Sequence, residues 1–374
     1  MGAVNVNVNI DRYRLQARRF DIVNSSRHTV AMAAARARRG TRHATVVDVA
    51  RIAGVAPNTV SRVLNNPAQV AEATRDRVLD AIRKTGYVPN LLAGGLRSAR
   101  SRLVAAVVPT IAGPVFLEAV EALTDALDEH GYQLILGQSG YKTSREDALL
   151  DAIIGRRPAG IVLTGVMHSA EARRRLAASG IPIVETWDLT RTPIDMVVGF
   201  SHEAIGEAVA EFFHRRKRRR PGVITGDDER AARRTSGFVR AAARLEMKGR
   251  GPAGTAVKTV PAPTTLASGR SGLAELLARE PKLDAVFCSS DLLALGVLTE
   301  AHARGIRVPH DLAVVGFGNL PFSAGVIPSL TTVHVDGPRI GRIAASMVVA
   351  RSEGRKVDEP VVDVGFSLVE RGST

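Results

Sequence analysis

The feature that most constrains the fold is a regular alternation of apolar, β-rich runs and helical stretches after residue 102. The runs are short and almost continuously apolar, as expected of parallel strands covered by helices on both faces. Eleven runs are too many for one compact doubly wound unit. We therefore expect two doubly wound α/β subdomains with a ligand cleft between them, beyond the carboxyl ends of their strands. The runs are 103–109, 132–137, 160–165, 181–186, 195–200, 221–226, 256–260, 285–290, 312–317, 331–336 and 360–366.

A purely helical pattern precedes these runs. Apolar residues at 46, 49, 50 and 53 have the i, i+3, i+4, i+7 spacing of a helix, and Gly54 ends it because glycine easily adopts a positive φ. Pro57 suits the first turn of a second helix over 57–64. A third helix is predicted over 72–84. Two short helices joined by a tight turn, with a third behind them, form a helix-turn-helix.

Positive charge is concentrated in the same part of the chain. Residues 1–44 carry a formal charge of +7, residues 45–100 carry +4, and the remaining 274 residues carry only +3. A basic head on a nearly neutral body is typical of nucleic-acid binding. A basic tail that serves only solubility is the alternative.

The second predicted helix has a polar face suited to DNA. Its apolar residues share one side, and the opposite side carries Pro57, Asn58, Ser61 and Arg62. Asn pairs with adenine and Arg with guanine in the major groove, each contributing ~1–3 kcal/mol of discrimination. An ordinary three-helix packing unit is the alternative. We expect phosphate contacts from Thr59, Asn65 and Thr74, and Thr45 completes the DNA-contacting set predicted for the head.

The residues from Asp48 to Asn90, DVARIAGVAPNTVSRVLNNPAQVAEATRDRVLDAIRKTGYVPN, resemble the head of the lactose-repressor (LacI/GalR) family. The similarity continues to Ser373. It implies that Pro57, Asn58 and Arg62 read bases. It also implies a hinge helix that contacts DNA and inserts a leucine wedge into the minor groove; its residues here are Asn90, Ala93 and Leu96.

Three departures from the family pattern affect the head. Ala56 and Ala71 stand where relatives carry a Ser or Thr helix cap, at a cost of roughly 0.5–2 kcal/mol each. Gly94-Gly95 lowers the helix propensity of the hinge. We therefore expect the hinge to fold only on the operator.

The resemblance also implies that the two subdomains form a core of the periplasmic-binding-protein type, with an effector site. Arg234 matches the arginine that binds effector oxygens in relatives, and its fork suits a carboxylate or paired hydroxyls. Phe116 aligns with an aromatic wall, and Asp291 aligns with the family's Asn-Asp pair, in which Ser290 replaces the Asn. Trp187 is predicted to stack on a sugar ring, with core packing as the alternative. Glu185 completes the expected effector set.

One substitution bears on the effector's charge. Many sugar-binding relatives carry an acid where this chain has Gly318, and losing a carboxylate favours an anionic ligand. The sequences VGFSHEA, GYKTSRED and VGFSLVERG are similar to the gluconate-repressor branch of the family. The resemblance thus implies a sugar-acid effector such as gluconate. Glu185 and Asp188 oppose this interpretation if they face the ligand.

The remaining features define the class. The sequence contains neither an apolar run of the ~18 residues needed to span a bilayer nor the apolar core of a signal peptide. Its single cysteine, Cys288, is predicted to lie in a strand. We therefore expect a cytosolic protein. We find no metal-ligand spacing, phosphate-binding loop or nucleophile elbow, and we expect no enzyme activity, metal or cofactor.

We therefore predict a repressor of a carbohydrate operon that binds a pseudo-palindromic operator as a homodimer or tetramer. The helix 341–350 contributes either to the dimer interface or to its own core. A sugar receptor without DNA regulation, and a regulator of a neutral sugar or nucleobase, are the alternatives. The expected divisions are a basic arm over 1–44, the helix-turn-helix over 45–88, the hinge over 89–101, and an effector-binding and dimerisation core over 102–374.

Overall fold

The computed structural model describes residues 44–88, 101–111, 114–141, 143–166, 168–249, 251 and 254–374. The predictions for the arm up to residue 43 and for the hinge residues Asn90, Ala93 and Leu96 lie outside these ranges. The chain divides into two compact units, Met1–Asn90 and Leu91–Thr374, which we call the head and the core and describe separately.

The head contains the predicted helices. They are α2 (Val46–Ala53), α3 (Pro57–Asn65), the 3₁₀ turn η1 (Pro67–Gln69) and α4 (Glu72–Thr85). Thr45 caps α2 in a capping box with Asp48, and Gly54 ends it with a φ of 65°. As expected from the sequence, the N-cap residues of α3 and α4, Ala56 and Ala71, make no side-chain hydrogen bond to the helix.

The three helices of the head enclose a small apolar core. Its buried residues are those at the helical spacing, and they come from all three helices: Val49, Ala50, Ala53, Val60, Val63, Val78 and Ala81. Helix α3 buries Val60 and Val63 and half-buries Thr59 and Leu64, so its opposite face is available for a partner.

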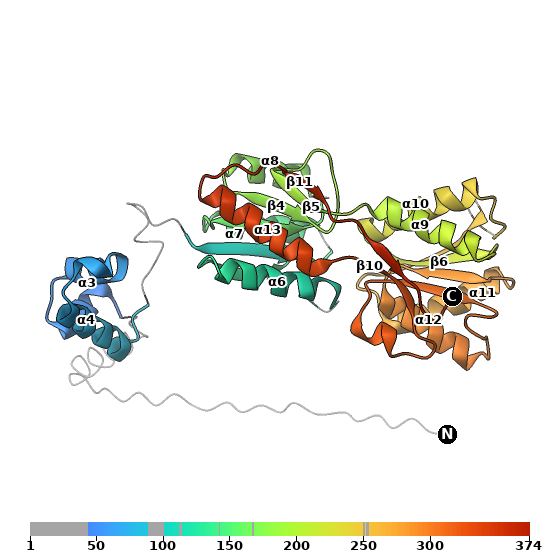
Figure 1. Cartoon of the computed structure of the whole chain (residues 1–374), viewed down its shortest axis with the longest axis horizontal. Coiled ribbons are helices and arrows are strands. Elements are labelled where there is room, and N and C mark those ends of the chain that lie inside the picture. Colours follow the sequence, from blue (N-terminus) through green and yellow to red (C-terminus); the bar gives the residue numbers. More distant parts are fainter. Residues whose placement is uncertain are drawn as a thin grey trace, which may run out of the picture. The chain divides into compact units, whose positions relative to one another are not determined.

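The core contains two six-stranded sheets, each covered on both faces (Figure 1). The first sheet is parallel throughout, in the order β11-β5-β4-β3-β1-β2. Helices α6 and α13 cover one face and α7 and α8 the other; we call this assembly the first lobe. Its elements are β1 (Leu103–Val108), η2 (Pro114–Phe116), α6 (Leu117–Asp128), β2 (Gln133–Gln138), α7 (Thr143–Ile154), β3 (Gly160–Thr164), α8 (Ala170–Ala178), β4 (Ile183–Thr186), β5 (Met196–Gly199), α13 (Gly337–Ser352) and β11 (Val361–Asp363).

The second sheet has the order β12-β10-β9-β8-β6-β7, and only the β10–β12 pair is antiparallel. Helices α9 and α10 cover one face and α11 and α12 the other, forming the second lobe. Its elements are α9 (His202–Arg215), β6 (Pro221–Gly226), α10 (Glu229–Arg244), β7 (Ala256–Val260), α11 (Leu266–Arg279), β8 (Ala285–Cys288), α12 (Asp291–Ala303), β9 (Ala313–Phe317), η4 (Pro321–Ala324), β10 (Thr331–His334) and β12 (Ser367–Val369).

The chain passes between the lobes three times, after β5, after β10 and after β11. All eleven predicted runs contain a strand, and Cys288 ends β8 as expected of a strand residue. The sequence analysis missed β12, whose three residues are exposed or half-buried and therefore lack the apolar signal of a central strand.

Helix α13 is part of the first lobe's own core. It packs against α6 and against β3, β4 and β5, and Ala344, Met347 and Val348 are buried there. Packing within the chain therefore accounts for these side chains without a dimer interface. In the described part of the chain, no helix is both long and apolar enough to cross a membrane.

Candidate functional sites: a helix-turn-helix face and an enclosed pocket

Helix α3 presents a continuous polar face to solvent. Pro57, Asn58, Ser61, Arg62 and Asn65 are all exposed, at the i, i+1, i+4, i+5, i+8 spacing of one helix face. Among the described residues, the side chains of Asn58, Ser61, Arg62 and Asn65 have no hydrogen-bond or ion-pair partner. They are therefore free to bind groups outside the chain.

The three threonines predicted to contact DNA differ in their surroundings. Thr45 is exposed, and its hydroxyl donates to Asp48 Oδ2 at 2.7 Å as part of the helix cap. Thr59 is half-buried, and Thr74 is half-buried and accepts a long contact of 3.5 Å from Arg77. Their hydroxyl groups are less available than the exposed side chains of α3.

A cavity of about 320 Å³ lies between the two lobes of the core, which is a usual size for a small-molecule site. Its walls come from the carboxyl ends of strands in both sheets, where the sequence analysis expected a cleft. The lining residues are Thr110, Pro114, Val115, Phe116, Tyr141, Trp187, His202, Asp228, Arg230, Arg234, Ala262, Pro263, Thr264, Thr265, Leu266, Ser289, Ser290, Leu292, Phe317 and Leu320.

Arg234 is the most deeply buried charged side chain of this cavity wall. It projects from α10 and is only 5% exposed. Its Nη1 donates to His202 Nδ1 at 2.9 Å and its Nη2 to the Ser289 carbonyl at 3.1 Å, while Nε has no partner among the described residues. The guanidinium lies over the Phe317 ring at 4.2 Å, and burial lowers the pKa of Arg234 to about 10. A buried cation without a hydrogen-bonded carboxylate is well suited to an anionic ligand.

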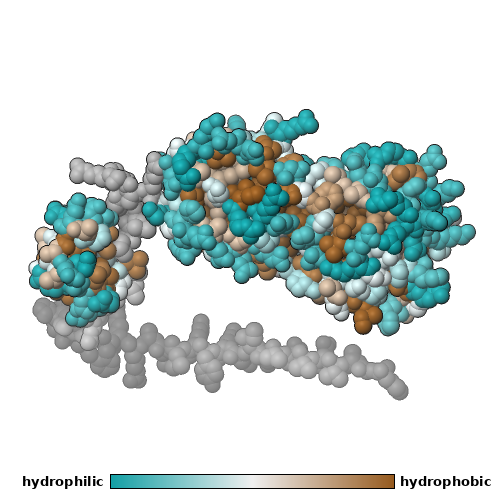
Figure 2. Space-filling view, in the orientation of Figure 1, coloured by the Kyte–Doolittle hydropathy of each residue, from teal (hydrophilic) through white to brown (hydrophobic). Residues whose placement is uncertain are grey.

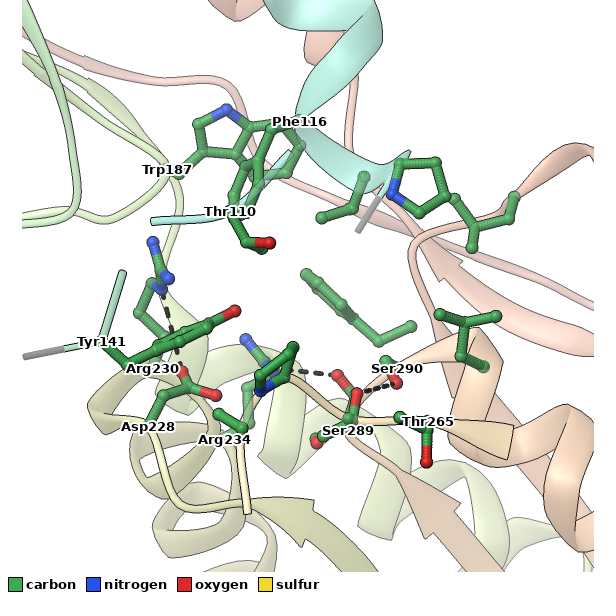
Figure 3. A pocket seen from close by; sticks show the side chains of 18 of the residues that line it. Thr110, Phe116, Tyr141, Trp187, Asp228, Arg230, Arg234, Thr265, Ser289 and Ser290 are labelled. Atoms are coloured by element: carbon green, nitrogen blue, oxygen red, sulfur yellow. Dashed lines mark hydrogen bonds and ion pairs between the residues drawn. The ribbon is translucent and has the colours of Figure 1, made fainter. Parts of the chain in front are cut away.

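A second arginine and the single carboxylate of the lining lie on another side of the pocket (Figure 3). Asp228 accepts from the Ala231 amide at 3.1 Å as the cap of α10, and Arg230 Nε lies 3.8 Å from the same carboxylate oxygen. Arg230 also lies 5.3 Å from the centre of the Phe116 ring. The lining therefore carries one more positive than negative charge.

Aromatic rings close the side opposite the serines (Figure 3). Trp187 meets Phe116 edge to face at 5.1 Å and Phe200 at 5.9 Å, and it is only 5% exposed. Its φ is 61°, which is uncommon for a residue other than glycine. Trp187 thus belongs both to the apolar core and to the pocket wall, so the two sequence-based interpretations of this residue are compatible.

Four of the six predicted effector residues, Phe116, Trp187, Arg234 and Ser290, line the cavity, and Glu185 and Asp291 do not. Glu185 is fully buried on β4. It accepts from the Ile194 amide at 2.7 Å and from Arg173 at 3.3 Å, and burial raises its pKa. The sequence did not reveal that β4 turns this side chain away from the ligand cavity.

Asp291 is likewise committed to the fold. Its carboxylate accepts from the Leu320 amide at 2.8 Å, Ser323 at 2.7 Å and Thr332 at 2.6 Å, and burial raises its pKa. It thereby joins α12 to the segment that follows β9. Asp188, the other carboxylate that opposed an acidic ligand, also lies outside the lining and pairs with Arg233 at 3.1 Å.

Sequence reasoning missed several residues of the lining. Thr110, Tyr141, Asp228, Thr265 and Ser289 each follow the carboxyl end of a strand, and this position was the available signal. His202 follows a lobe crossing and was also missed. Ser290, which was predicted, caps α12 and exchanges a hydrogen bond of 2.9 Å with Thr264.

A smaller cavity of about 190 Å³ adjoins the first and shares five lining residues with it, Pro114, Val115, Trp187, Phe317 and Leu320. Gly318 lines this second cavity with a φ of 126°. A Cβ atom there would approach nothing closer than 3.5 Å, so the backbone conformation, rather than space, is what disfavours an acid at this position.

Comparisons with known proteins agree with this architecture. Residues 45–90 match the model for bacterial regulatory proteins of the lacI family, and residues 210–374 match the periplasmic binding protein-like domain. The HTH-type transcriptional regulator GntR of Pseudomonas aeruginosa is 40% identical over 337 residues, covering 90% of this chain and 97% of the relative. This chain belongs to the lacI family. It is a DNA-binding transcriptional regulator.

Solved structures of family members are also similar. A LacI-family transcriptional regulator from Silicibacter pomeroyi superposes with a TM-score of 0.82 at 32% identity, over 88% of this chain and 99% of that one. A complex of the transcriptional regulator CelR with cellobiose gives a TM-score of 0.64 at 29% identity, over 88% of this chain and 100% of that one. The two-lobed core is thus the fold of known regulators.

Proposed function

We propose that this regulator represses a carbohydrate operon in the cytoplasm and that its effector is a sugar acid such as gluconate. The observation that carries the effector assignment is the buried Arg234 guanidinium, which has a free Nε and no hydrogen-bonded carboxylate within the described residues. An effector carboxylate would supply the missing acceptor. The similarity to GntR regulators supports the same class.

The polar groups around the cavity suit the remainder of such a ligand. Ser289, Ser290 and Thr265 line one side and offer hydroxyl groups, and Asp228 accepts hydrogen bonds from ligand hydroxyls. The Phe116 and Trp187 rings that line the cavity suit contact with the C–H groups of a polyol. Because Glu185, Asp188 and Asp291 lie outside the lining, they do not repel an anion from direct contact.

Isothermal titration of the full-length protein tests the effector assignment. We expect binding of gluconate, and much weaker binding of gluconamide, which has the same shape without the charge. Glucose and cellobiose report on neutral sugars, and cellobiose is the ligand in the CelR complex. Equal affinity for gluconate and gluconamide, or binding of neutral sugars alone, would refute the sugar-acid assignment.

We propose that α3 reads the operator through Pro57, Asn58 and Arg62. Their exposure on one face, and the lack of intramolecular partners for Asn58 and Arg62 among the described residues, support this role. We assign contacts with the DNA phosphate backbone to five further residues of the head, Ser61, Asn65, Thr59, Thr74 and Thr45. We assign the minor-groove contacts of the hinge to Asn90, Ala93 and Leu96. A gel shift on the gene's own upstream region, with and without gluconate at stated salt, tests the coupled function.

We propose that a homodimer forms at the free edge of the first sheet. Apolar residues lie in patches among hydrophilic ones on the visible surface of the core (Figure 2). At the edge strand β2, Ile135 is 50% and Leu136 41% exposed, and an uncovered edge with apolar side chains favours pairing. A two-fold dimer would place two heads on the half-sites of a pseudo-palindrome.

The oligomeric state measured by sedimentation tests this interface. Leu136→Glu is expected to produce monomers that bind the operator weakly. Val361→Glu, on the opposite edge strand β11 with 41% exposure, is the matched control and should remain dimeric. A dimeric Leu136→Glu protein would place the interface elsewhere.

Effector binding would act by population shift. The cavity is lined by both lobes, so a ligand that binds one lobe arrangement better than the other changes their relative populations. By linkage, operator binding must then change effector affinity by the same factor. Titrating gluconate with and without operator measures that factor directly, and a factor of one would contradict the proposed switch.

A further inference from the structure

His202 is the first residue of α9, immediately after the chain crosses from the first lobe to the second. It is 1% exposed and also lines the cavity. Its Nε2 lies 3.0 Å from the carbonyl oxygen of Trp187 in the first lobe, and its Nδ1 lies 2.9 Å from Nη1 of Arg234 in the second. One imidazole therefore bridges the two walls of the pocket.

Close packing of two helices brings His202 to Arg234. Gly206, one turn after His202, lies against the Arg234 carbonyl, where a Cβ atom would come within 1.9 Å. Gly237 on α10 lies equally close to the Glu203 carbonyl, at 2.1 Å. Because both glycines lack a side chain, the backbones of α9 and α10 can approach each other so closely.

The contacts of His202 specify its tautomer. A carbonyl only accepts and a guanidinium only donates. Nε2 must therefore carry the proton that is donated to the Trp187 carbonyl, and Nδ1 must be unprotonated in order to accept from Arg234. Burial and the nearby charges of Arg234, Arg230 and Arg233 hold the pKa of His202 well below its usual value. The flanking Phe200 and Phe317 rings, at 4.8 and 6.4 Å, add no charge.

We propose that His202 is a positioning residue of the effector site, which holds the Arg234 guanidinium in its ligand-binding orientation and ties it to the Trp187 main chain across the cavity. Without an acceptor at Nδ1, the Ser289 carbonyl and the Phe317 ring are the contacts that remain to the Arg234 guanidinium among the described residues. The inference rests on the proposed effector site and adds to it the means by which ligand contact in one lobe is transmitted to the other.

Two substitutions of nearly equal shape test this role in the full-length protein. His202→Asn keeps an acceptor near the Nδ1 position, whereas His202→Leu removes it. We expect gluconate affinity within about 3-fold of wild type for Asn and a loss of roughly 10- to 100-fold for Leu, the range for a hydrogen bond to a charged group. His310→Asn and His310→Leu serve as matched controls, because the His310 side chain is exposed on the second lobe, and both should leave the affinity for gluconate unchanged.

Thermal unfolding of each variant separates positioning from loss of fold. A purely structural role predicts equal affinity losses for folded Asn and Leu variants, and that result would overturn the proposal, as would wild-type affinity in the Leu variant. If the Leu variant does not fold, ¹⁵N-histidine NMR of the ligand-free wild type decides, with the signal assigned from His202→Asn. The neutral Nε2–H form should persist at pH 5.5, and an imidazolium or Nδ1–H form overturns the inference.

The NMR measurement needs no ligand. If the wild type fails to bind gluconate while the Nε2–H tautomer is observed, the effector assignment has failed and the bridge from Trp187 to Arg234 stands. If gluconate binds and His202 is protonated, the proposed function stands and the positioning role is refuted. The two failures are therefore distinguishable.

Discussion

Replacing Arg234 with methionine removes the buried charge from the cavity while keeping most of the apolar stem. The ligand-free protein should tolerate this change. Burial lowers the pKa of Arg234 from its ordinary value to about 10, which corresponds to roughly 3 kcal/mol of unfavourable free energy for holding the charge there. The variant loses two hydrogen bonds of about 1 kcal/mol each. It also loses the stacking on Phe317, worth ~1–2 kcal/mol.

These opposing contributions nearly cancel, so the free energy of unfolding should change by no more than about 2 kcal/mol. Effector affinity should fall much further. Two charge-assisted hydrogen bonds to a carboxylate contribute ~2–4 kcal/mol together, which corresponds to a loss of roughly 30- to 1000-fold. The perturbation therefore separates ligand binding from folding.

Differential scanning fluorimetry measures both effects in one experiment. At 100 times the dissociation constant, gluconate should stabilise the wild type by about 2.7 kcal/mol and raise Tm by roughly 5 °C. Arg234→Met should unfold near the wild-type temperature without gluconate and, at the same gluconate concentration, shift by no more than about 2 °C. Arg240→Met, an exposed arginine on the same helix paired with Glu207, should keep the full shift. Retention of the gluconate shift by Arg234→Met would refute the anion-binding role.

Three further predictions concern the head and the pocket histidine. Arg62→Ala should reduce discrimination at one operator base by ~1–3 kcal/mol in competition binding at stated salt, whereas Arg83→Ala, on the exposed side of α4, should not. Ala71→Ser supplies the missing cap of α4 and should slow amide exchange in that helix, with a stabilisation of ~0.5–2 kcal/mol; unchanged exchange would contradict the cap assignment. Because the pKa of His202 is lowered in the folded protein, the unfolded chain binds a proton that the folded chain does not, so acidification below pH 6.5 should destabilise the wild type. Urea titrations between pH 7 and 5 measure this effect: the free energy of unfolding of the wild type should fall by up to ~1.4 kcal/mol per pH unit more than that of His202→Asn. If the free energy of unfolding changes with pH in the same way in both proteins, the lowered pKa of His202 is refuted.

Local sequence patterns were sufficient to predict the three helices of the head and eleven of the twelve strands that the structure describes in the core. Apolar residues at a spacing of three and four define α2 and α3 because a helix buries one stripe, and continuous apolar runs define the central strands because both faces of each sheet are covered. Proline and glycine mark the helix ends through their backbone preferences, as at Pro57 and Gly54. The strand β12 escaped detection because it lies at a sheet edge and buries little.

The exposed polar face of α3 was equally predictable, since the positions exposed on a single helix follow from its spacing. A cleft beyond the strand ends was also expected, but most residues of the pocket wall were not, because they come from strand ends that are distant in sequence and from both lobes. Resemblance to the family pointed to Arg234 and Phe116, but it could not show which way neighbouring side chains turn. Glu185 and Asp291 bind main-chain amides and hydroxyls of their own lobes instead of facing the cavity. His202 acquires its place because two glycines let α9 and α10 meet, a contact that depends on the packing of helices and leaves no periodic signal in the sequence.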